Sequence, residues 1–172
     1  MIALLLNGTL IRFLFFFLFF WQVVGLEIVP QAVKDAEENA KFNDIPNAAF
    51  LVGRAEQTLK VALKDSSEFS SIVGIVDPPR SGLHRDVIKG LRKCRKLQNL
   101  IYVSCNPSGT LLEDAVALCS PIDESSSNQI KKHGLPFRPV RAVPVDLFPH
   151  TDHCEMVVLF TRIAQQKTKV SQ

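Results

Sequence analysis

Three residues able to bind ligands or to react lie at the ends of apolar, strand-like segments. Glu27 follows VVGL, Asp77 closes SIVGIVD and Cys105 closes LIYVSC. In nucleotide-binding sheets an acid at such a position bonds ribose hydroxyls, and a cysteine thiolate can serve as a nucleophile. Simpler interpretations exist, because a strand-end aspartate is often satisfied by backbone donors and a lone cysteine is commonly a small buried hydrophobe.

The elements that must position these residues alternate between strands and helices. Compact apolar runs predict strands at residues 23–28, 48–53, 71–77 and 100–105. Start signals and helical spacing predict helices at about 30–42, 54–63, 85–94 and 107–119. Strands at about 140–147 and 155–161 flank the turn FPHTDH and are predicted to pair as a hairpin. This alternation predicts an α/β fold with a mainly parallel sheet, covered on both faces, whose ligands bind at the carboxyl ends of strands.

Length and composition restrict the protein class only loosely. The chain has 172 residues, enough for one domain with a core, and a net charge of +3 that does not by itself indicate a nucleic-acid binder. Its four cysteines are scattered without a C-x-x-C pair, which argues against a disulfide framework and against a zinc ribbon.

Residues 1–22 form a hydrophobic leader, and Phe and Leu fill residues 13–20. A secretory signal would need a basic start and a small-residue cleavage site, and neither is evident. A transmembrane helix needs about 20 apolar residues, which residues 2–24 reach only by including one charged and several polar residues. Because Phe and Leu codons are pyrimidine-rich, we hypothesise a translated intron tract before Gln22. A normal coding exon spanning residues 1–30 would disprove this.

Three motifs after the leader occur in a recognisable order. They are DPPRSG at 77–82, YVSCNP at 102–107 and the closing AVPVDLFPHTDHCEMVVLFTR. Together they resemble the RNA 5-methyluridine methyltransferases, and the resemblance covers Val23 to Arg162. It implies a Rossmann-like catalytic domain that uses S-adenosyl-L-methionine and acts on tRNA uridine. We therefore expect a partial catalytic domain at residues 23–163 and a disordered tail at 164–172.

The resemblance implies a role for four residues. Cys105 occupies the family's nucleophile position, and Glu155, in HCEMV, occupies the position of the proton acceptor. Thiolate addition at uracil C6 makes C5 nucleophilic, and a base must remove the C5 proton before the thiolate leaves. Asp77 is expected close to the cofactor and the target base, and Glu27 at the ribose of the cofactor.

Other candidates carry weaker signals. Arg80 could hold a carboxylate or phosphate or form a structural ion pair, and Glu56 could lie near the adenine. Two histidines and a cysteine at 150–154 lack a fourth partner, so we expect no metal site. A basic set could meet RNA phosphates or form a solvated helix face. It comprises Arg85, Lys89, Arg92, Lys93, Arg95 and Lys96.

The main departure from the family lies before Glu27. The family's cofactor site normally starts with a strand and a Gly-rich turn of the D-x-x-C/Y-G-x-G-T kind, and this place holds LLNGTLIRFLFFFLFF. Loss of that strand would leave the centre of the sheet unfilled, and the chain is expected to be truncated at its N-terminal side. The alternative function is an inactive isoform that binds RNA or a membrane at most. We expect a monomer in the cytoplasm or nucleus, unless residues 2–24 span a membrane.

Overall fold

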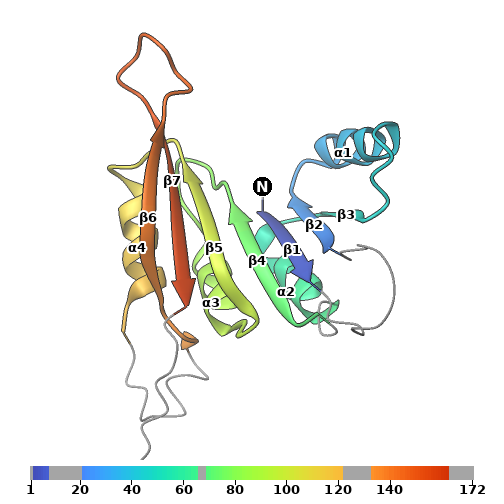
Figure 1. Cartoon of the computed structure of the whole chain (residues 1–172), viewed down its shortest axis with the longest axis horizontal. Coiled ribbons are helices and arrows are strands. Elements are labelled where there is room, and N and C mark those ends of the chain that lie inside the picture. The colour runs from blue at the N-terminus through green and yellow to red at the C-terminus, as the bar shows by residue number, and fades with distance from the viewer. Residues whose placement is uncertain (1, 8–20, 66–68, 122–132, 163–172) are drawn as a thin grey trace, which may run out of the picture.

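The computed structural model describes residues 2–7, 21–65, 69–121 and 133–162 (Figure 1). The predictions for the Phe-rich segment and the polar tail lie outside these residues. The strands are β1 Ile2–Asn7, β2 Trp21–Glu27, β3 Ala48–Val52, β4 Ser71–Val76, β5 Leu97–Ser104, β6 Phe137–Val145 and β7 Glu155–Arg162. The helices are α1 Pro30–Phe42, α2 Ala55–Asp65, α3 Arg85–Lys93 and α4 Thr110–Cys119.

In the described parts of the chain, seven strands form one sheet with the order β3-β2-β1-β4-β5-β7-β6. β2 and β3 pair in parallel, as do β4 and β5. β1 and β7 run against their neighbours, so the other five strands share one direction. The predicted α/β class and the C-terminal β6–β7 hairpin are confirmed.

The centre of the sheet is filled, contrary to the expectation of a gap. β1 lies between β2 and β4 and pairs with both in antiparallel register. Its Leu4 is completely buried in the core. The apolar run IALLL satisfies the two open strand edges with backbone hydrogen bonds, which a missing strand would have left unpaired. Because β1 is reversed, its carboxyl end lies at the edge opposite to Glu27.

Helices cover both faces of the sheet, as predicted. On one face α2, α3 and α4 lie side by side over the main core, which includes Leu59, Leu91, Leu100 and Leu118 (Figure 1). α1 packs against β2 and β3, and its buried Val33 lies outside that cluster. Along β4 and β5 the residues under α2–α4 are buried and the alternate residues are half-buried.

Two buried arginines tie the ends of helices to the sheet. Arg162 of β7 is 6% exposed and donates to the carbonyl oxygens of four residues, with its guanidinium 4.1 Å from the ring centre of Phe137. These four acceptors are Leu91, Cys94, Leu97 and Leu135. Burial lowers the pKa of Arg162 to about 10, so the side chain remains a cation at neutral pH.

The position of Arg92 contradicts its assignment to an exposed basic face of α3. This side chain is 5% exposed and donates to the carbonyl oxygens of Ala117, Ser120 and Gly134. It therefore caps the last turn of α4 and does not face RNA. Lys89 is paired with Asp86 at 3.2 Å, on an exposed surface.

Several element ends differ from the sequence-based boundaries. α4 begins at Thr110 and not at Pro107, because residues 107–109 form a turn that joins it to β5. β6 begins at Phe137 although it contains Pro139 and Pro144. Proline is tolerated there because β6 is an edge strand, whose outer donors have no ladder partner. Within the described ranges, no helix is both long and apolar enough to cross a bilayer.

Candidate active site

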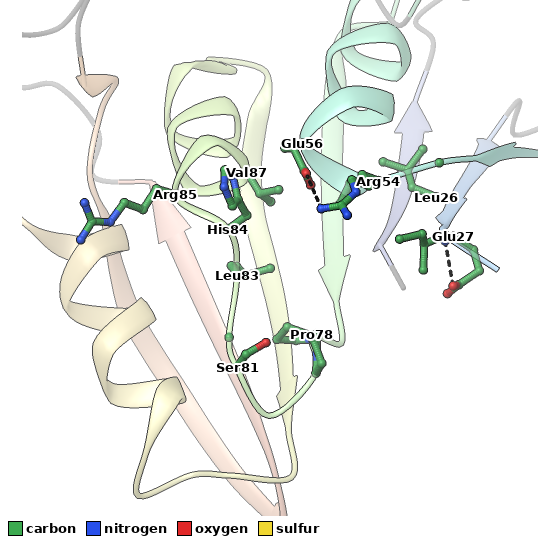
Figure 2. Close-up of a pocket in the computed structure, with 15 residues that line it drawn as sticks. Leu26, Glu27, Arg54, Glu56, Pro78, Ser81, Leu83, His84, Arg85 and Val87 are labelled. Atoms are coloured by element: carbon green, nitrogen blue, oxygen red, sulfur yellow. Dashed lines mark hydrogen bonds and ion pairs between the residues drawn. The ribbon is translucent and has the colours of Figure 1, made fainter.

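A cavity of about 660 Å³ opens at the carboxyl ends of β2 and β3 and beside the turn that follows β4 (Figure 2). Glu27, Gly53 and Glu56 lie along one part of its lining. Pro78, Pro79 and residues 81–85 and 87 form another part. Small-molecule sites commonly have volumes of about 300–1,000 Å³, so a ligand of nucleoside size or larger fits here.

Glu27 lies where the sequence placed it, at the rim of this cavity. Its Oε1 accepts hydrogen bonds from the backbone N–H groups of Ile28 (2.8 Å) and Val29 (3.0 Å). These amides precede α1, so the carboxylate is held in a fixed position beside the helix start. The second acid, Glu56, lies in the first turn of α2 and forms an ion pair with Arg54 at 3.8 Å (Figure 2).

Cys105 directly follows β5, and Glu155 is the first residue of its antiparallel neighbour β7. The β5–β7 register pairs Asn99 with Thr161 and ends with Ser104 opposite Met156. Cys105 directly follows Ser104 and Glu155 directly precedes Met156, so both lie at the same end of this strand pair. One strand pairing therefore brings two residues that are fifty positions apart in sequence to the same end of the sheet.

The carboxyl group of Glu155 has an unusual environment. Its Oε2 is shielded from solvent and has no hydrogen-bond partner among the described residues. A carboxylate oxygen buried in this way is costly unless a partner arrives, because it has lost its hydration. Cys105 is half-buried and is a free thiol. The pair thus presents a thiol and an unsatisfied carboxyl oxygen at one end of the sheet.

Asp77 reaches the same region from β4. The parallel register pairs Val76 with Tyr102, so Asp77 follows β4 at the level of Val103 of β5. Asp77 and Cys105 follow the last residues of two parallel neighbours, β4 and β5, so they lie at the same edge of the sheet. Burial and then the hydrogen bond to Asp114 raise the pKa of the Tyr102 phenol, and the charges of Asp77 and Cys105 raise it further.

Sequence inspection missed Asp114 and Tyr102. Asp114 is 7% exposed, and its Oδ2 accepts from the Tyr102 hydroxyl at 2.6 Å and from the Leu83 N–H at 2.7 Å. The position of Asp114 in the sequence was the signal that could have indicated its burial, because it lies on the same helical stripe as the buried Leu111 and Leu118. An acid within an apolar stripe requires a buried partner.

The remaining candidates have exposed side chains. Arg80 has an exposed side chain, while its carbonyl oxygen accepts from Thr110 Oγ1 at 3.1 Å. His150 and His153 are exposed on the hairpin tip. Over the described part of the chain, no group of three metal-ligating side chains comes together.

A model of the tRNA (uracil-5-)-methyltransferase family matches residues 13–163. The chain belongs to this family. The match begins inside the Phe-rich segment and ends one residue after β7. It includes every candidate residue of the two sites described above.

Individual relatives agree with this membership. The tRNA (uracil-5-)-methyltransferase homolog B of Mus musculus is 46% identical over 141 residues, which are 82% of this chain and 28% of that protein. Homolog A of Homo sapiens is 45% identical over 142 residues, or 83% and 21% of the two chains. The chain thus spans less than a third of the length of these relatives. The structure of a precorrin-6y C5,15-methyltransferase of Geobacter metallireducens is similar over 80% of this chain and 66% of its own, with a TM-score of 0.46 and 13% identity.

Proposed function

We propose that this chain carries the catalytic centre of an RNA uracil-5-methyltransferase that forms 5-methyluridine in tRNA. The observation that carries the proposal is the β5–β7 pairing, which ends with Ser104 opposite Met156 and so supports a meeting of the adjoining residues Cys105 and Glu155 at one end of the sheet. The two residues come from the motifs SCNP and HCEMV, in a chain that belongs to the tRNA (uracil-5-)-methyltransferase family. The buried, unpartnered Oε2 of Glu155 supports a role in which a substrate atom completes its surroundings.

The cavity fits S-adenosyl-L-methionine in size and in the chemistry of its rim. Glu27 at the end of β2 would bond the ribose hydroxyls, and Glu56 would lie toward the adenine. Pro78 and Pro79 supply apolar surface to the lining of the cavity. When bound, this cofactor supplies an electrophilic methyl group.

Cys105 would add through its sulfur to C6 of the uracil ring. The new S–C6 bond moves the ring electrons toward C5 and O4, so that C5 becomes nucleophilic and accepts the methyl group. Glu155 would then take the proton from C5. The electrons of that C–H bond re-form the C5–C6 double bond and expel the Cys105 thiolate.

Cofactor binding gives the first test, by isothermal titration of the chain with S-adenosyl-L-methionine. We expect Glu27→Gln to weaken binding by about tenfold or more, since a hydrogen bond to a charged group contributes about 1.5–3 kcal/mol. The amide oxygen of Gln can still accept from the Ile28 and Val29 N–H groups, so the start of α1 is kept.

Glu38→Gln is the matched control for Glu27→Gln, because Glu38 is an exposed acid of α1 that pairs with Lys34. It should leave the affinity unchanged. Equal loss in both variants would mean that net charge, and not the cavity, governs the titration. No binding by the unaltered chain at millimolar cofactor would reject the methyltransferase proposal.

A second candidate function is an inactive isoform that binds RNA at most. The reversed direction of β1 favours it, because a parallel first strand would bring a turn to the cofactor edge and β1 brings its amino end instead. The backbone approach that a Gly-rich turn gives to a cofactor is then absent at β1 in the described residues. RNA binding without cofactor binding would favour this candidate.

A further inference from the structure

We infer that Asp114 is a positioning residue that fixes the Asp77–Leu83 turn relative to the strand of the nucleophile. This inference rests on the proposed function and deepens it. Asp114 is the fifth residue of α4, which starts directly after the turn of residues 107–109 that follows Cys105. Asp114 does not itself line the cavity, and it contacts the lining through the backbone N–H of Leu83. Any effect on chemistry must therefore act through the groups it holds.

The carboxyl group of Asp114 joins two segments that are remote in sequence. One oxygen, Oδ2, accepts from Tyr102 Oη (2.6 Å) and from Leu83 N (2.7 Å). Tyr102 is completely buried and lies three residues before Cys105. Leu83 closes the turn that begins at Asp77 and lines the cavity. A single atom therefore links the cavity wall to the nucleophile strand.

Neighbouring contacts show that the turn is built around this carboxyl group. Gly82 has φ +78°, and a Cβ atom there would lie 3.0 and 3.2 Å from the two Asp114 oxygens. A side chain at this position would meet both a strained backbone and the buried acid. Thr110, one helical turn before Asp114, donates to the carbonyl oxygen of Arg80. α4 thus holds the turn at two successive points.

The Tyr102 hydroxyl remains a donor at any working pH. Burial is the main cause that raises the pKa of this phenol, and the hydrogen bond to Asp114 raises it further. A protonated phenol directs its hydrogen to Oδ2 and leaves that oxygen aligned for Leu83 N. Loss of the acid would leave the buried Tyr102 hydroxyl and the partly buried Leu83 N–H without their acceptor, and the turn would be free to shift.

The test compares Asp114→Ala, Asp114→Asn and Leu118→Ala. Leu118 is fully buried on the same helix, one turn further on, and so provides a variant that loosens α4 without touching the turn. Two quantities are measured below the melting temperature of every variant. They are the dissociation constant for S-adenosyl-L-methionine and the rate of covalent adduct formation with 5-fluorouridine RNA.

We expect Asp114→Ala to slow adduct formation by on the order of 10²-fold, as for a misplacement of about 1 Å, and to weaken cofactor binding. Asp114→Asn should retain most of the rate of adduct formation and most of the cofactor affinity, because its amide oxygen can accept from the same two donors. Leu118→Ala should lower the melting temperature and change neither quantity. Equal effects of Asp114→Ala and Leu118→Ala, or no effect of Asp114→Ala, would overturn the assignment.

Hydrogen exchange separates failure of this inference from failure of the proposed function. If the unaltered chain binds no cofactor and forms no adduct, the proposed function fails. The positioning role of Asp114 is then judged by amide hydrogen exchange over residues 78–84, a measurement that needs no ligand. Faster exchange of these amides in Asp114→Ala than in Leu118→Ala supports the positioning role. Exchange in Asp114→Ala that is unchanged from the unaltered chain overturns it.

Discussion

Cys105→Ala should form no covalent adduct with 5-fluorouridine RNA and should reduce methyl transfer to background. Fluorine at C5 cannot leave as a proton does, so after methyl transfer the elimination is blocked and the enzyme stays attached to the RNA. Without the Cys105 sulfur no bond to C6 forms, and C5 is not activated. The readout is the mass of the intact protein after incubation with RNA and cofactor.

Glu155→Gln should behave in the opposite way on ordinary uridine RNA. Addition and methyl transfer remain, while removal of the C5 proton is lost, so the adduct should accumulate and turnover should fall by about 10²–10⁴-fold. Cys119→Ala serves as the control, because Cys119 lies on α4 beside Arg92 and away from the β5–β7 pair. Accumulation of adduct in Cys105→Ala, or normal turnover in Glu155→Gln, would contradict the assigned roles.

Arg162→Leu should prevent stable folding. The guanidinium supplies donors to four backbone carbonyl oxygens from the end of α3, the start of β5 and the segment before β6. Each buried acceptor left without a donor costs about 1–3 kcal/mol, and four of them approach a typical total stability of about 5–15 kcal/mol. Thermal denaturation followed by circular dichroism should show no cooperative transition, or one far below that of the unaltered chain.

Two further variants separate loss of these hydrogen bonds from loss of charge. Arg162→Lys keeps the cation, but one nitrogen cannot serve acceptors spread over the whole guanidinium plane, so stability should be only partly recovered. Arg141→Leu removes an exposed arginine of the neighbouring strand β6 and should change stability by no more than about 0.5 kcal/mol. An unaltered melting temperature for Arg162→Leu would show that these bonds are replaced by other donors.

The sequence predicted most elements because their signals are local. Short apolar runs such as SIVGIV and LIYVS, bounded by turn residues, indicate strands, and β4 starts where expected while β5 begins three residues earlier than predicted, at Leu97. The hairpin of β6 and β7 followed from a turn between two apolar runs. The ends of the strands then placed Glu27, Asp77 and Cys105 at one edge of the sheet.

The direction of β1 could not be read in the same way. The segment IALLLN has no periodicity that distinguishes a parallel from an antiparallel neighbour, and its partners lie twenty and seventy residues away. Backbone pairing fills the gap between β2 and β4 with whichever apolar segment can reach it. A strand was therefore expected to be missing where a reversed one is present.

The roles of buried polar residues were the other feature that could not be predicted from the sequence. Arg92 was grouped with exposed basic residues because its spacing fits the polar face of α3, yet it is buried beneath the end of α4. Asp114 resembles an ordinary helical acid until its two donors, 12 and 31 residues away, are known. Such roles depend on tertiary partners, which no local pattern specifies.

Mapping of the adduct peptide tests the central claim most directly. The unaltered chain is incubated with S-adenosyl-L-methionine and 5-fluorouridine RNA, digested with nuclease and protease, and sequenced by tandem mass spectrometry. The roles proposed for Cys105 and Glu155 require one methylated nucleotide attached to the sulfur of Cys105. Attachment at Cys94, Cys119 or Cys154, or no attachment while the chain binds both cofactor and RNA, would contradict them.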